Sequence, residues 1–103
     1  MEMAKYILSI FKTQIMVVWS WGFNSPIAVE NGLRFKVQGF KFHGVVEVKY
    51  NEGWDLFDIS FIKAGKVVKV IEGVYLDTLV ETIDNYVEKT SDYEKRVKDT
   101  YSI

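Results

Sequence analysis

The sequence predicts an α+β fold: an N-terminal helix, a mostly antiparallel meander sheet of four to six strands, and a C-terminal helix, with both helices on one face of the sheet. Two observations support this prediction. Apolar residues recur at helical spacing in the segments before and after the sheet, and they alternate with polar residues in the short runs between. Turn residues separate these runs at hairpin-like intervals, so consecutive strands are expected to pair.

The first helix is expected over residues 3–12, where apolar side chains form one stripe: Met3, Tyr6, Ile7, Ile10 and Phe11. Residues 15–19 are β-branched and aromatic, which favours a strand, with a continued helix as the alternative. Residues 22–26 contain turn formers, and residues 27–30 follow as a short strand.

Four further strands are expected where the apolar period is two, at residues 33–37, 41–50, 54–62 and 66–71. Asn31 and Gly32 are expected to form a type I′ hairpin turn, which needs a positive φ at both positions. Gly53 is expected in the left-handed conformation of the next hairpin loop. Gly73 is expected to end the sheet.

A second helix is predicted from Tyr75, with an apolar stripe at Leu76, Leu79, Val80, Ile83, Tyr86 and Val87. Tyr93 and Val97 hint that this helix continues, with a frayed tail over about residues 90–103 as the alternative. Residues 1–103 contain no linker, repeat or low-complexity tract, so they are expected to form one domain.

The composition excludes several classes of protein. The chain has no cysteine and one histidine, His43, which excludes disulfide scaffolds, thiol nucleophiles and histidine-rich metal sites. The net charge of −1 gives no overall signal for nucleic acid. Glu2 and Lys12 flank an N-terminal apolar run too short and too charged for a signal peptide. A soluble cytoplasmic protein without a cofactor or a membrane partner is therefore expected.

Aromatic residues supply one set of candidate binding residues. Trp19, Trp21 and Phe23 are close together beside a turn, and Trp54 follows another turn. The structural interpretation is that these rings close the ends of the core. The functional interpretation is an exposed patch that binds a partner or a second copy of the chain.

Basic residues supply a second set. Arg34, Lys36, Lys41 and His43, together with Lys49, are predicted on one sheet face, near the aromatic ring of Phe40. Such a face binds a single nucleic-acid strand by charge and stacking. The charge is uneven along the chain, because residues 72–88 carry five acidic groups and no basic one. This acidic segment is either a solvated helix face or the electrostatic complement of the basic half.

Catalytic and metal signatures are weak. Asp77, Glu81 and Asp84 lie at helical spacing and fit a solvated helix face better than a cation site. His43 has no predicted orienting partner. Asp58 lies within an apolar strand, so it needs a hydrogen-bonding partner if its face is covered.

Three stretches together resemble small uncharacterised bacterial proteins of about this length: residues 19–22 (Trp-Ser-Trp-Gly), residues 33–37 with the loop at 50–53, and residues 74–84. The resemblance covers most of the chain and implies no activity or binding residue. The function expected from the residues is that of a non-enzymatic accessory or binding protein that contacts another protein or itself. Single-stranded nucleic-acid binding through the basic face is the alternative, and a small enzyme that uses His43 or Asp58 is the second alternative.

Overall fold

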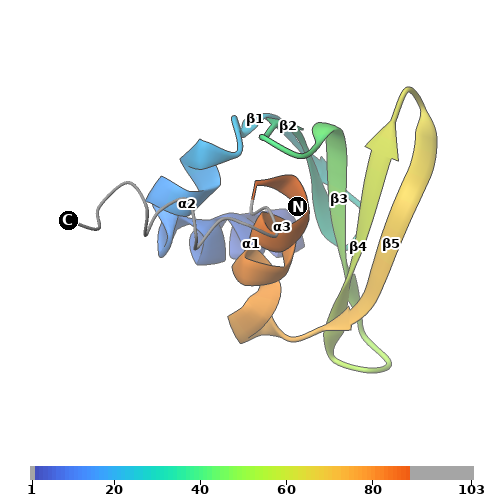
Figure 1. Ribbon diagram of the computed structural model, residues 1–103. Helices are drawn as coiled ribbons and strands as arrows, with labels where there is room; N and C mark the ends of the chain where they lie inside the picture. Colours follow the sequence, from blue (N-terminus) through green and yellow to red (C-terminus); the bar gives the residue numbers. More distant parts are fainter. Residues whose placement is uncertain (1, 89–103) are drawn as a thin grey trace.

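The computed structural model describes residues 2–88 and confirms the predicted α+β fold (Figure 1). A meander of five antiparallel strands lies in the order β1-β2-β3-β4-β5. The predicted tail at residues 90–103 lies outside the described residues. The elements are α1 (Glu2–Lys12), α2 (Ile15–Ser20), β1 (Asn24–Val29), β2 (Gly32–Gln38), β3 (His43–Asn51), β4 (Leu56–Lys63), β5 (Lys66–Val74), the 3-10 helix η1 (Leu76–Thr78) and α3 (Leu79–Val87).

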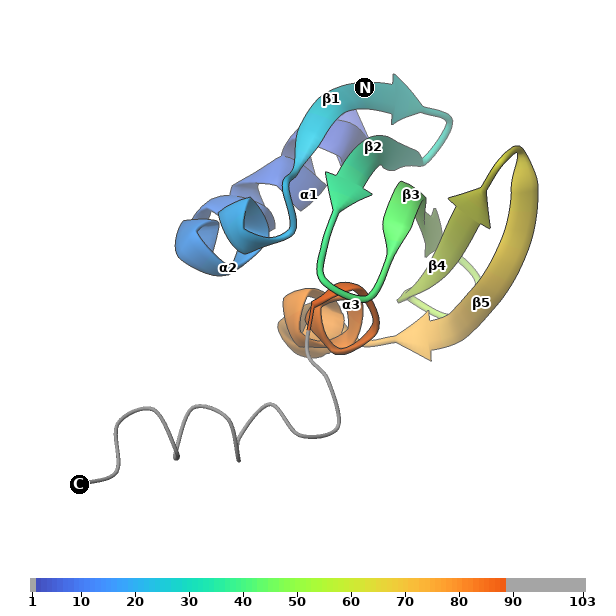
Figure 2. The same cartoon turned by 45° about the horizontal axis from the view of Figure 1, so that its top comes forward.

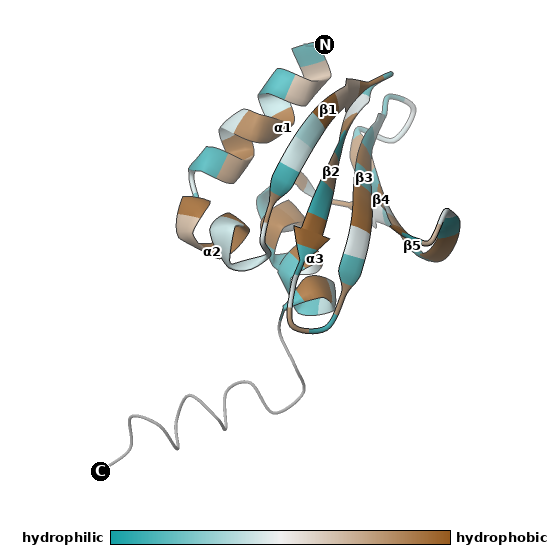
Figure 3. Ribbon diagram, turned by 90° about the horizontal axis from the view of Figure 1, so that it is seen from above, coloured by the Kyte–Doolittle hydropathy of each residue, from teal (hydrophilic) through white to brown (hydrophobic). Residues whose placement is uncertain are grey.

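The core lies between the helices and one face of the sheet. Cross-strand register places Phe35 opposite Val46, and Val46 opposite Phe61, and all three are buried. α1 and α3 contribute buried residues to the same apolar cluster, and Figures 1 and 2 show the helices on one side of the sheet. We call the other side the open face; it carries Arg34, Lys36, Val45, Glu47, Lys49, Asp58, Ser60 and Ile62. Figure 3 shows hydrophilic and hydrophobic residues alternating along β2.

The prediction of a strand over residues 15–19 is wrong, because this segment forms the helix α2. The amide groups of Val17 and Val18 both donate to the carbonyl of Gln14, which starts the helix. In the helix Val18 is buried while its neighbour Trp19 stays exposed. The β-branched side chains favoured a strand, but packing against the core overrides such weak local preferences.

The hairpin between β1 and β2 is confirmed, but its turn is not the expected one. Val29 pairs with Gly32, so the two loop residues are Glu30 and Asn31, and only Asn31 has a positive φ, of 54°. Gly32 is needed for a different reason. A Cβ atom at this position would lie 2.1 Å from the carbonyl oxygen of Val48, so the close approach of β2 and β3 excludes a side chain there.

Strand boundaries differ from the prediction at three places. β1 begins at Asn24 and contains Pro26, which an edge strand tolerates because one side of it has no ladder. β4 begins at Leu56, and the left-handed residue of the preceding loop is Asp55, with a φ of 55°, instead of Gly53. β5 continues to Val74, through the expected stop.

The loop between β2 and β3 closes the C-terminal end of α3 (Figure 2). The Lys41 amide donates to the Val87 carbonyl at 2.8 Å, and its ammonium donates to the Asn85 carbonyl at 2.5 Å. The Phe40 amide donates to the Glu88 carboxylate at 2.7 Å. The last carbonyls of a helix lack partners within it, so this loop supplies them. Lys41 therefore leaves the predicted basic face and serves the fold.

Candidate functional site

The predicted basic face is only partly present. Arg34, Lys36, His43 and Lys49 lie on the open face, as predicted. However, the Glu47 carboxylate accepts hydrogen bonds from Arg34 at 2.9 Å and 2.5 Å, and it lies 3.8 Å from the Lys49 ammonium. One central acid thus offsets two of the four cations. The remaining charge does not form the continuous basic track that a phosphate backbone follows.

The predicted aromatic patch is divided by the helix α2. Along a strand Trp19 and Trp21 would share a face, but two residues along a helix are turned by about 200°. Trp21 is consequently buried, stacks on Phe35, and donates its indole N–H to Asp84 at 2.9 Å. Phe23 packs against the core beside Phe35. The interpretation of Trp21 as an exposed binding residue is wrong, whereas Trp19 remains 65% exposed.

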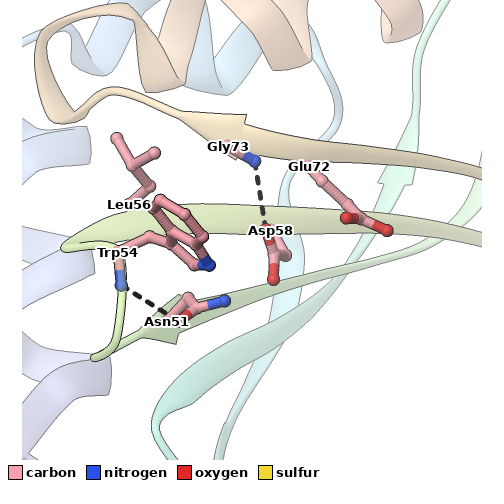
Figure 4. A pocket seen from close by; sticks show the side chains of 6 residues that line it. All are labelled: Asn51, Trp54, Leu56, Asp58, Glu72 and Gly73. Carbon is pink, nitrogen blue, oxygen red and sulfur yellow. Dashed lines mark hydrogen bonds between the residues drawn. The ribbon is translucent and has the colours of Figure 1, made fainter.

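Trp54 is the most exposed of the three tryptophans, at 77%, and it borders a concavity of about 360 Å³ (Figure 4). We call this hollow the Trp54 concavity. It is formed where the loop after β3, the start of β4 and the end of β5 meet. The residues that line it are Asn51, Trp54, Leu56, Asp58, Glu72 and Gly73.

The loop that carries Trp54 is held from two sides. The Trp54 amide donates to the side-chain oxygen of Asn51 at 3.3 Å. The hydroxyl of Tyr50 donates to the carboxylate of Asp55, the residue with the positive φ. Asp is one of the few residue types that adopt this conformation readily. These contacts fix the backbone on both sides of the indole while its ring projects into solvent.

A β-bulge opens the strand side of the concavity. Between the pairs Phe57–Val74 and Ile59–Ile71 the ladder shifts register, and Gly73 has a φ of 69°. The Gly73 amide donates to the Asp58 carboxylate at 3.1 Å, as Figure 4 shows. This bond answers the need of Asp58 for a partner. Gly73 was missed as a site residue, although a lone glycine inside an apolar strand is a signal for a bulge.

Asp55 raises the pKa of Tyr50 above its ordinary value of 10.0, chiefly because the phenol donates a hydrogen bond to the carboxylate. We therefore expect Asp55→Asn to lower the pKa of Tyr50, since it removes the charge that opposes the phenolate. Asn also tolerates the positive φ, so the loop should persist. Titration of the 295 nm absorbance, with Tyr50→Phe to identify the signal, measures the shift.

The sign of the linked stability follows from the raised pKa. The Tyr50–Asp55 contact stabilises the folded protein while the phenol is protonated in both states. This contribution is lost as the pH rises through the folded-state pKa of Tyr50. An Asp55→Asn protein whose Tyr50 titrates as in the parent would contradict the assignment of this hydrogen bond.

The second exposed feature is β5, which lies at one edge of the sheet and pairs only with β4. Its nine residues are exposed or half-buried apart from Val74. Val67, Val68 and Val70 are 57%, 51% and 45% exposed. In Figure 1 the β4–β5 hairpin extends away from the helices. An edge strand of this kind presents unpaired backbone groups beside apolar side chains.

The other predicted groups are not assembled into a site within residues 2–88. His43 is exposed in a shallow hollow with Lys36 and Gln38. Asp84 is bound to Trp21, apart from the exposed Asp77 and Glu81. In that described range no group of three or more metal-ligating side chains occurs, and no helix is long and apolar enough to cross a membrane.

Comparisons of this chain with protein-family models, curated proteins and solved structures find no match. The Trp54 concavity and the β5 edge are therefore interpreted from their own geometry.

Proposed function

We propose that this chain is a non-enzymatic binding protein that associates with a second copy of itself through the outer edge of β5. The observation that carries the proposal is the exposure of three valines along that edge strand. Adding a strand there would satisfy the free backbone groups and cover the valines together. The opposite edge, β1, is less suited to pairing, because it contains Pro26 and a register shift between Asn24 and Ile27.

The charges along the β4–β5 hairpin favour an antiparallel second copy. Lys63, Lys66 and Lys69 lie at the start of the edge and at the hairpin tip, and no acidic residue occurs between them. Glu72 and Asp77 follow at the other end. In an antiparallel pair the lysine half of each copy lies along the acidic half of the other, and the two-fold axis repeats this match. A parallel pair would instead bring like charges together.

Charge reversal tests this proposal. We expect sedimentation velocity at micromolar concentrations to show reversible dimers of the parent chain. Lys66→Glu with Lys69→Glu should weaken the dimer about tenfold, because it removes cross-strand opposite-charge pairs twice. Adding Glu72→Lys and Asp77→Lys to the same chain should restore association, since both halves are then reversed.

Ile27→Lys is the matched control, because Ile27 is 59% exposed and lies in the opposite edge strand. It should leave the dimer unchanged, whereas Val70→Lys should weaken it. A chain that stays monomeric up to high micromolar concentration would overturn the proposal. Binding of a single-stranded oligonucleotide that weakens steeply with salt would instead favour the basic face as the functional surface.

A further inference from the structure

The Trp54 concavity has a composition that the fold itself does not require. A tryptophan 77% exposed leaves most of a large apolar ring in water, which gives folding little in return. The loop would accept a polar residue at the same position. The bulge at Gly73 and the two loop contacts nevertheless hold the surrounding groups in place. These features together are typical of a small binding site with preset geometry.

From this arrangement we infer that the Trp54 concavity binds a guanidinium group, as carried by an arginine side chain of another polypeptide. The inference concerns a different set of residues from the three valines of the proposed dimer edge and does not depend on self-association.

The charge of the concavity calls for a cation. Asp58 and Glu72 give its lining a formal charge of −2, and none of the described residues that line it is basic. Asp58 accepts one hydrogen bond, from Gly73, through one of its two oxygens. Within residues 2–88 the Glu72 carboxylate takes part in no hydrogen bond or ion pair. A neutral ligand would cover these carboxylates without compensating their charge, which is costly.

The aromatic ring narrows the choice among cations. An indole face attracts a positive charge more strongly than the other aromatic side chains do. A guanidinium is planar and weakly hydrated, so it can stack on the ring while its edge donates to a carboxylate. An ammonium is a strongly hydrated point charge and gains less from such a stack. Figure 4 shows the indole and the two carboxylates around the same hollow, from the loop, β4 and β5.

A polypeptide source fits the position of the hollow. It opens beside the exposed end of β5, because Glu72 and Gly73 belong to that edge strand. An extended segment that passes along the edge can therefore place one side chain into it. A free small molecule with the same group would have fewer contacts in so shallow a hollow.

The test uses N-acetyl-arginine amide as the probe and follows the three indole N–H signals by two-dimensional NMR. We expect a saturable shift of the Trp54 signal, assigned with Trp54→Phe, and none for Trp21, whose N–H is bound to Asp84. N-acetyl-citrulline amide, the neutral analogue, should give no shift. Asp58→Asn with Glu72→Gln should weaken binding at least about fivefold, because two charge-assisted contacts are lost.

Glu52→Gln is the matched control, since Glu52 is an exposed acid of the same loop that does not line the concavity. It should bind the probe as the parent does. Repeating the titration with the Val70→Lys chain separates this inference from dimer formation. An equal response to citrulline, a response only to methyl glucoside or tetramethylammonium, or no response at millimolar probe would overturn the inference. Free arginine that binds as tightly as an arginine-containing pentapeptide would overturn the polypeptide source.

Discussion

Replacement of Trp21 by alanine is expected to remove about 3–5 kcal/mol of unfolding free energy, the largest loss of any single substitution considered. The ring is fully buried, meets Phe11 edge-on with centroids 5.8 Å apart, and stacks on Phe35 at 6.4 Å. Alanine would leave a cavity among these rings and would also strand the Asp84 carboxylate without its donor. Because domains of this size have only about 5–15 kcal/mol in total, the variant should be close to unfolding.

Urea unfolding followed by circular dichroism measures this loss. Trp54→Ala is the matched control, since it deletes the same side chain from an exposed position and should change stability by less than about 0.5 kcal/mol. Trp21→Phe keeps most of the apolar volume but removes the donor to Asp84, so it should fall between the two. Equal losses for Trp21→Ala and Trp54→Ala would contradict the placement of Trp21 in the core.

Gly39→Ala is expected to cost about 1–3 kcal/mol, because a Cβ atom at this position has no room. It would lie 2.3 Å from Cγ1 of Val87 and 2.5 Å from the Val87 carbonyl oxygen, at the end of α3. The loop would have to withdraw, which would stretch the Lys41 amide bond to the same carbonyl. Faster hydrogen exchange of the Lys41 amide should accompany the lost stability.

Gly53→Ala is the control for this substitution. Its nearest neighbour to an added Cβ is the Asn51 side-chain oxygen at 3.4 Å, an ordinary contact, and Gly53 is not among the residues with a positive φ. Alanine there should be neutral or slightly stabilising, because it restricts the unfolded chain. If the two variants lost the same stability, the loop between β2 and β3 would not pack against α3 in solution.

The candidate site was only half predictable. Trp54 was selected from the sequence because an aromatic ring beside a turn has no obvious place in the core, and Asp58 because it interrupts an apolar strand. Glu72 and Gly73 were not grouped with them, although they line the same concavity. They are 14 or more residues further along the chain, and only the register of β4 with β5, with its bulge, brings them to Asp58.

The sequence by itself determined the order of elements and the two faces of β2, β3 and β4, because alternation with a period of two leaves one way to bury the apolar set. The tertiary structure decided what local preference leaves ambiguous. Burial of Val18 and Trp21 made residues 15–20 a helix, and the open end of α3 drew Lys41 away from the sheet face. Both outcomes depend on partners more than 40 residues distant, Asp84 and Val87, whose satisfaction outweighs a few tenths of a kilocalorie of propensity.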